Sequence, residues 1–167
     1  LTLEEFLDYT QNRGDFKYII EIKNGGEAGK KALDILYNTL IERDILDRVI
    51  FGTFNGEISE YASENYPDLI RSASIKEVVE FYLAALLGRK GYEPPVKVLQ
   101  VFYGKKYFKF GVNLATSRVI NYAHSHNMAI QYWTINDEDE IRYLLSIGVD
   151  GIMTDYVEKA FEIKKEY

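Results

Sequence analysis

Several residue types and patterns are scarce or absent in this sequence. It contains no cysteine, so disulfide bonds and thiolate metal sites are excluded, while the redox compartment stays undecided. No apolar run is long enough to span a membrane, and no signal-peptide pattern opens the chain. Its 20 Lys and Arg are outnumbered by 26 Asp and Glu, and a net charge of -6 argues against nucleic acid or an anionic membrane as the main partner. We therefore expect a soluble protein without a transmembrane segment. The sequence does not decide its compartment, although it slightly favours the cytoplasm.

Length and composition indicate one ordinary globular domain over residues 1–167. The chain is 47% hydrophobic and 28% charged, and 167 residues suffice for one sizeable core but not for two comfortable domains. It opens on Leu1 rather than methionine, and Thr2 and Glu5 have the spacing of a helix-capping box. An abrupt start on a helix suggests a piece of something longer; a trimmed tag is the alternative.

Apolar periodicity predicts alternating helices and strands. Leu33, Leu36, Tyr37, Leu40 and Ile41 form one helical stripe of the kind that covers a sheet. The predicted helices cover residues 3–11, 28–44, 58–65, 75–87, 117–126, 138–146 and 157–167. The predicted strands cover residues 18–23, 49–54, 68–72, 96–103, 128–133 and 148–155.

Six strands alternating with helices favour a parallel sheet with crossover connections. An open doubly wound sheet and a (β/α)8 barrel both satisfy this pattern. Residues 24–26 (NGG) lack the spacing of a dinucleotide-binding glycine fingerprint. In either fold, function belongs at the carboxyl ends of the strands. Those ends carry Glu21, Lys23, Asn55, Ser74, Gln100, Trp133, Asn136 and Asp155.

The strand at residues 18–23 (YIIEIK) is the most informative one. Side chains alternate along a strand, so Glu21 and Lys23 share a face with Ile19. Burying a carboxylate there requires a cation, which is either Lys23 or a metal ion. On these residues alone, a neutralising pair and a functional site are equally supported.

An ordered set of short motifs resembles the glycerophosphodiester phosphodiesterase family, whose fold is a (β/α)8 barrel. The matching segments run in that family's order over nearly the whole chain. They are residues 2–5 (TLEE), 20–23 (IEIK), 51–55 (FGTFN), 99–101 (LQV), 123–124 (AH), 133–136 (WTIN) and 148–155 (GVDGIMTD).

The resemblance implies an incomplete barrel of about six βα units. The family's paired catalytic histidines and its Glu-x-Asp metal motif lie on the first two strands, and no predicted strand here carries either motif. We therefore expect residues 1–167 to correspond to strands 3–8 of such a barrel. Unpaired edges on its first and last strands would favour a homo-oligomer or association with the missing N-terminal segment.

The resemblance also implies roles for four residues. Glu21 matches a metal-binding carboxylate, and Lys23 a catalytic cation that holds the phosphate or stabilises its transition state. Trp133 matches an aromatic that packs against the glycerol side of the substrate, and we add Gln100 as a rim contact. The cofactor would be Mg²⁺ or Ca²⁺, bound weakly or not at all by one carboxylate, because both ions need several oxygen ligands.

For the histidines, for the lysines after residue 103 and for Asp155, we prefer a structural role to a catalytic or ligand-binding one. His124 and His126 point to different sides of a helix end away from the strand ends, so we expect structural roles. Lys105, Lys106 and Lys109 alternate with aromatics after the strand at 96–103, and we expect a solvated loop rather than a phosphate-attracting surface. We expect Asp155 to cap the last helix.

Two functions remain in competition. The first is metal-dependent hydrolysis of a small-molecule glycerophosphodiester to glycerol phosphate and an alcohol, with this chain an inactive fragment that lacks the histidine pair. The alternative is a non-catalytic, barrel-derived binding or scaffold protein.

Overall fold

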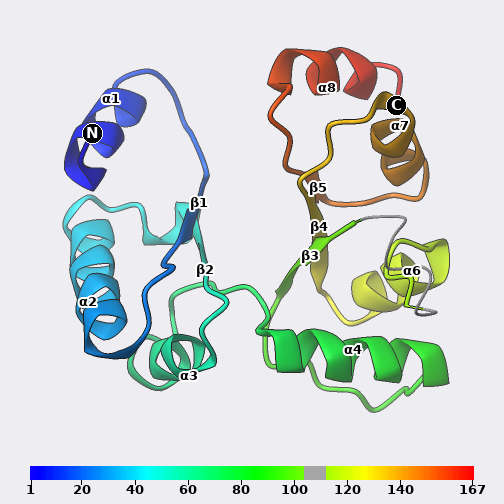
Figure 1. The fold of residues 1–167 in the computed structure, drawn as a ribbon, viewed down its shortest axis with the longest axis horizontal. Helices are drawn as coiled ribbons and strands as arrows, with labels where there is room; N and C mark the ends of the chain where they lie inside the picture. Colours follow the sequence, from blue (N-terminus) through cyan, green and yellow to red (C-terminus); the bar gives the residue numbers. More distant parts are fainter. Residues whose placement is uncertain (104–111) are drawn as a thin grey trace. The chain divides into compact units, whose positions relative to one another are not determined.

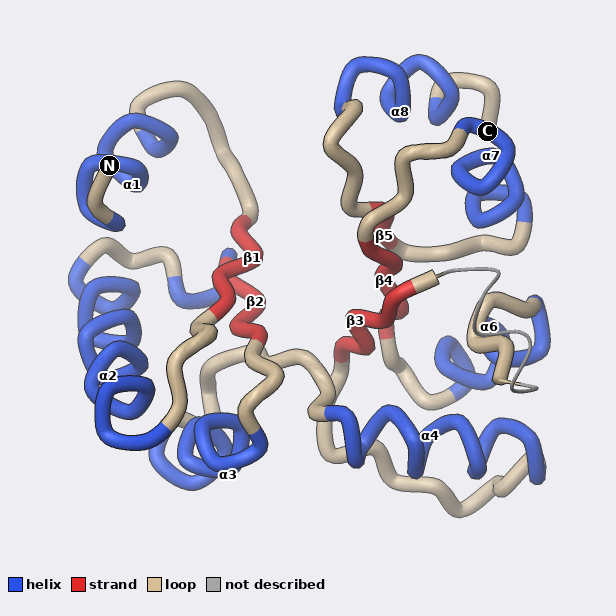
Figure 2. The backbone as a smooth tube through the Cα atoms, viewed as in Figure 1, coloured by secondary structure: helices blue, strands red, loops and turns tan. Residues whose placement is uncertain are grey.

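The computed structural model describes residues 1–103 and 112–167 and divides the chain into two compact units, Leu1–Arg71 and Ser72–Tyr167. In each unit, helices cover one face of parallel strands, and each has its own hydrophobic core (Figures 1 and 2). The α/β class with parallel strands is as predicted. That residues 1–167 form one domain stays a prediction.

The first unit builds a two-stranded parallel sheet. Residues pair from Tyr18 with Val49 to Glu21 with Gly52. Its elements are α1 (Leu3–Gln11), β1 (Tyr18–Glu21), α2 (Gly26–Glu42), the 3-10 helix η1 (Leu46–Arg48), β2 (Val49–Gly52) and α3 (Gly56–Asn65).

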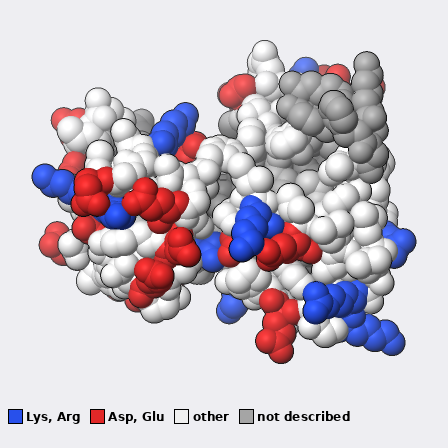
Figure 3. Space-filling model, turned by 60° about the horizontal axis from the view of Figure 1, so that its bottom comes forward, with Lys and Arg blue, Asp and Glu red and all other residues white. Residues whose placement is uncertain are grey.

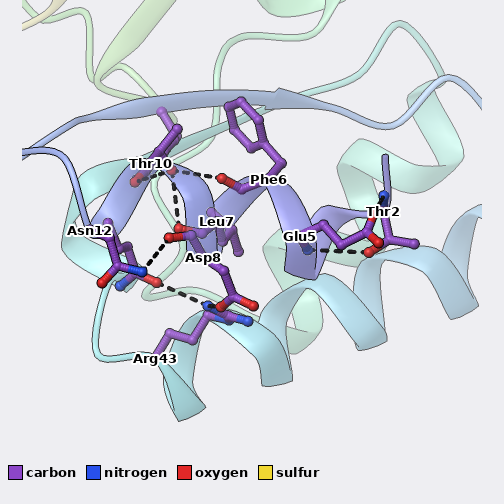
Figure 4. Close-up of polar contacts among 10 residues, drawn as sticks. Thr2, Glu5, Phe6, Leu7, Asp8, Thr10, Asn12 and Arg43 are labelled. Carbon is purple, nitrogen blue, oxygen red and sulfur yellow. Dashed lines mark hydrogen bonds and ion pairs between the residues drawn. The ribbon is translucent and has the colours of Figure 1, made fainter.

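Local polar contacts hold α1 in place (Figure 4). The predicted capping box is present, since Thr2 Oγ1 accepts from the Glu5 amide at 3.2 Å and Glu5 Oε2 accepts from the Thr2 amide at 2.8 Å. At the other end of the helix, Arg43 Nη1 lies 2.7 Å from Asp8 Oδ1 and joins α1 to the C-terminus of α2. The only side chain of α1 that is buried is Leu7, so these contacts supplement a small apolar one.

The core of the first unit depends on a close approach of α2 to α3. Leu33, Leu36 and Leu40 of the predicted stripe are buried, whereas Ile41 is exposed. Gly29 lies one turn before Leu33, and a Cβ there would stand 2.4 Å from the Asn24 carbonyl oxygen and 2.7 Å from Ile58 Cδ1. Glycine therefore lets the two helices meet over the buried Ile58.

The second unit builds a three-stranded parallel sheet in the order β3-β4-β5. Tyr132 of its central strand is fully buried, and its hydroxyl donates to the Leu114 carbonyl at 2.9 Å. Burial raises the pKa of Tyr132 above its ordinary value, so the phenol stays neutral. The elements are α4 (Ile75–Leu87), β3 (Val98–Phe102), α6 (Ser117–Ser125), β4 (Ala129–Trp133), α7 (Glu138–Ser146), β5 (Gly151–Ile152) and α8 (Val157–Lys164).

Two predicted strands differ from what the structure shows. The strand predicted at 68–72 is absent, and only single bridges join Arg71 to Phe51 and Ser72 to Val98. Pro67 and Asp68 form a turn there, so too few residues are left extended for a ladder. The strand predicted at 148–155 is reduced to β5, because its only pairing within the described chain is with Gln131 and Tyr132.

The contact at Gly29 yields a stability prediction. We expect Gly29→Ala to lower the free energy of unfolding by about 1–3 kcal/mol, because the added methyl group overpacks a closed helix–helix contact. Urea denaturation of the purified chain measures the change. The matched control is Gly56→Ala at the start of α3, where nothing lies within 4 Å of the new Cβ. We expect it to change stability by no more than about 0.5 kcal/mol. Equal stabilities for the two variants would contradict this account.

Candidate functional site

Glu21 and Lys23 lie together at the carboxyl end of β1. Alternation is as predicted, with Tyr18 and Ile22 buried on one face and Glu21 and Lys23 exposed on the other. Lys23 Nζ stands 4.0 Å from Glu21 Oε2, and the two side chains are 82% and 36% exposed. Because neither charge is desolvated, the pair contributes little to stability. Both groups are accessible to a ligand.

Asn55 follows β2 and serves as a helix cap. Its Oδ1 accepts from the amides of Glu57 at 3.1 Å and Ile58 at 3.4 Å, at the start of α3. Its amide nitrogen lies so close to Gly25 that a Cβ there would be 2.1 Å away. Ser74 likewise caps α4 in a capping box with Glu77. Both residues were predicted to lie at strand ends, and both are explained by helix capping.

Lys30, on the first turns of α2, is a second cation near the carboxyl end of β2, and the sequence analysis did not identify it. Its Nζ lies 2.8 Å from Glu57 Oε1 and 3.1 Å from Glu27 Oε1. These hydrogen bonds raise the pKa of Lys30, and the bond from Lys30 lowers the pKa of Glu57. Two carboxylates already neutralise Lys30, so Lys23 is the better candidate of the two for binding an anion.

In the second unit, Gln100 and Trp133 lie on neighbouring strands and share one face of the sheet. Gln100 Nε2 donates to Gln131 Oε1 at 3.0 Å, and the ring centroids of Phe102 and Trp133 are 6.0 Å apart at an interplanar angle of 63°. Strand register places these pairs two residues apart. The sequence analysis did not identify Gln131. It alternates with the buried Ile130 and Tyr132, so it faces the same side of the sheet as Trp133.

Asn136 and Asp155 join the loops that follow β4 and β5. Asn136 Nδ2 donates to Asp155 Oδ2 at 2.8 Å, while Asn136 Oδ1 accepts from the Asp155 amide at 3.0 Å and the Thr154 hydroxyl at 3.1 Å. The prediction that Asp155 caps α8 is wrong, because Tyr156 occupies the N-cap position and no side chain caps the helix. The Asp155 carboxylate is instead drawn to the Asn136 amide.

The two histidines have structural contacts, as expected. His124 Nε2 lies 3.0 Å from Asp150 Oδ2, which also accepts from the Ile130 amide. His126 Nδ1 lies 2.8 Å from the Tyr122 carbonyl oxygen, with its ring against that of Tyr122. The prediction about Lys105, Lys106 and Lys109 falls outside the described residues.

The described side chains do not by themselves make a site for Mg²⁺ or Ca²⁺. Within residues 1–103 and 112–167, no three His, Cys, Asp or Glu side chains gather closely enough to hold a metal ion. Glu21 is the single carboxylate at the end of β1, and these ions prefer six or more oxygen ligands.

None of the described helices has the length and apolar character needed to cross a membrane.

The contacts at the ends of β1 and β2 predict which polar residues stabilise the fold. We expect Glu21→Gln and Lys23→Met each to change the free energy of unfolding by less than about 0.5 kcal/mol, since both side chains are exposed. Asn55→Ala, which removes a helix cap, should cost about 1 kcal/mol. Urea denaturation of the three variants provides the comparison. A large loss of stability in Glu21→Gln would identify the pair as structural.

Comparison with known proteins relates this chain to phosphodiesterases. It is 26% identical over 167 residues to a glycerophosphodiester phosphodiesterase of Bacillus altitudinis and 24% identical over 166 residues to an uncharacterized protein of Bacillus subtilis (strain 168). In both comparisons the alignment covers 98% of this chain and 62% of the relative. The chain therefore spans less than two thirds of the length of these relatives.

Solved structures show the same fold. A glycerophosphodiester phosphodiesterase from Parabacteroides distasonis matches 99% of this chain, through 64% of its own, with a TM-score of 0.74 at 19% identity. One from Agrobacterium tumefaciens matches 98% of this chain, through 61% of its own, with a TM-score of 0.66 at 13% identity. The predicted barrel-type α/β fold is confirmed by this likeness. The model of the Glycerophosphoryl diester phosphodiesterase family matches residues 1–159, and the chain belongs to that family.

Proposed function

We propose that the protein containing this chain hydrolyses glycerophosphodiesters to glycerol phosphate and an alcohol. The observation that carries the proposal is the family match over residues 1–159, which includes the exposed Glu21–Lys23 pair at the end of β1. A carboxylate beside an ammonium group suits a site that takes a metal ion and a phosphate together.

In this proposal the four predicted residues keep distinct roles. Glu21 supplies one carboxylate ligand to Mg²⁺ or Ca²⁺, and further oxygen ligands are needed to complete the coordination of either ion. When bound, such an ion polarises the phosphoryl oxygens. The Lys23 ammonium binds a phosphate oxygen and stabilises the charge that develops on it. Gln100 and Trp133 contact the organic part of the substrate.

We propose that the groups that transfer protons lie outside the described residues. The only histidines of the chain are His124 and His126, and the first is engaged with Asp150 and the second with Tyr122. Neither histidine follows a strand, where the ligands of this fold bind. We infer that residues 1–167 alone are inactive.

The strand edges are where such groups would join the chain. Within the described residues, β1 pairs only with β2, and β5 pairs only with β4. Next to β5 lies a groove of about 510 Å³ whose lining is largely apolar and includes Leu145, Ile152, Met153, Val157 and Phe161. A parallel strand with one unpaired edge beside an apolar groove favours addition of a further strand. We propose that an N-terminal segment, or else a second copy, supplies it.

A non-catalytic binding or scaffold function is the second candidate. The specific observation in its favour is that the described residues offer one carboxylate at the proposed metal position and no cluster of three potential ligands. In that case, the chain would retain phosphate binding through Lys23 without turnover.

Substitution of Glu21 tests the proposed enzyme in the complete protein. We expect Glu21→Ala to lower metal-dependent kcat/KM for glycerophosphocholine by more than about 100-fold. Substitution of residues that only hydrogen-bond to metal ligands already lowers metal affinity or activity by about 10- to 100-fold, and Glu21 is proposed to be a ligand itself. Calorimetric titration with Mg²⁺ or Ca²⁺ should show weaker binding, and the unfolding curve should be unchanged. Lys30→Ala is the matched control, because Lys30 is already neutralised, and it should retain activity. Full activity of Glu21→Ala would remove Glu21 from the site.

A further inference from the structure

Helix α4 is apolar on two opposite sides. Its inner side packs Phe81 and Ala85 into the core of the second unit, and Ala84 is also buried. Its outer side carries five apolar side chains that are between 43% and 81% exposed, namely Ile75, Val79, Leu83, Leu86 and Leu87. We call this set the α4 stripe. A surface helix normally has a polar outer face, and one that is apolar all round is normally covered.

The spacing of the stripe suits a contact with a copy of itself. Ile75, Val79, Leu83 and Leu87 recur at every fourth position, which makes them one ridge of the helix surface. Ridges of this kind interdigitate in the commonest class of helix packing. When a second helix runs antiparallel about a two-fold axis, Val79 faces Leu83 of the second copy, and Ile75 and Leu87 extend the contact. A two-fold contact requires a surface that is complementary to itself in this manner.

The charges around the stripe favour the antiparallel direction. The first half of α4 carries Glu77 and Glu80 and one cation, Lys76, whose Nζ lies 3.9 Å from Glu80 Oε1, so this half has a net negative charge. Basic Arg89 and Lys90 follow the C-terminus of the helix. Antiparallel packing brings the acidic end of one helix to the basic end of the other and also opposes the two helix dipoles. Parallel packing would place like charges together. Figure 3 shows uncharged surface between charged residues on this side of the second unit.

We propose that the α4 stripe is the contact between two copies of this chain, packed antiparallel about a two-fold axis. The contact lies on none of the residues assigned to the candidate site. It is also separate from the open edge of β5, because no residue of α4 lines the groove there. The proposed dimer is therefore distinct from a second copy that binds at the edge of β5, and it does not depend on the proposed activity.

Sedimentation equilibrium of the wild-type chain and of Leu83→Glu tests the contact. We expect a reversible wild-type dimer and a rise of more than about 100-fold in its dissociation constant for Leu83→Glu, because a two-fold axis buries the new charge twice. The matched control is Phe161→Glu on α8, which is 58% exposed against 53% for Leu83 and lines the groove at β5. The control should dimerise like wild type. A monomeric wild type at its highest soluble concentration, or a dimer broken only by Phe161→Glu, would overturn the proposal.

The direction of packing is tested by cross-linking, since the chain has no cysteine of its own. We expect a mixture of Val79→Cys and Leu83→Cys chains to form disulfide-linked heterodimers faster than either variant forms homodimers. Faster homodimers of Val79→Cys would indicate parallel helices and contradict the proposal. The proposal would also be contradicted by a monomeric chain that binds phosphatidylserine vesicles through Leu83. The α4 stripe would then be a lipid-binding face.

Discussion

Parallel pairing of short strands is the constraint on which the other features of this chain depend. A parallel pair needs a crossover between its strands, and here the crossovers are helices such as α2 and α6. It also directs the carboxyl ends of paired strands to the same edge, so polar residues that follow β1 and β2, or β3 and β4, come together within each unit. The pairing thus produces both the apolar face under the helices and the polar edge where ligands of this fold bind.

At that polar edge, structural and functional demands compete for the same residue types. Asn55 and Ser74 satisfy exposed amides at helix starts, and Asn136 ties two loops together. Among the residues that the structure describes, Glu21 and Lys23 satisfy no such amide, and both side chains are exposed. An exposed ion pair contributes little to the stability of the fold. The Glu21–Lys23 pair is therefore a better candidate for a functional role than the capping residues.

Helix α4 illustrates how one helix can meet two demands. A single apolar side suffices to cover β3 and β4, and Phe81 and Ala85 provide it. The additional ridge on the outer side does nothing for the described core of the second unit. The ridge is best covered by a surface that matches its shape and runs its charges in the opposite direction, as an antiparallel second copy does.

Much of the local structure follows from the sequence alone. The bounds of α1, α4 and α7 are those predicted, because capping residues and apolar periodicity act within one helix. The ordered motifs likewise identified the family from residues such as those at 133–136 and 148–155. The sequence also marked Glu21 and Lys23, since alternation along a strand is a local rule.

Tertiary structure decided the features that depend on distant partners. The sequence shows that Val79 and Leu87 are apolar but not that they face outward, because the orientation of a helix depends on which of its ridges packs against the sheet. The pairing of Gln100 with Gln131 needed the register of two strands, and the Asn136–Asp155 contact that displaced a predicted cap needed two loops to meet. Residues 68–72 have strand-like composition yet form only two bridges, because a ladder requires neighbours in register as well as propensity.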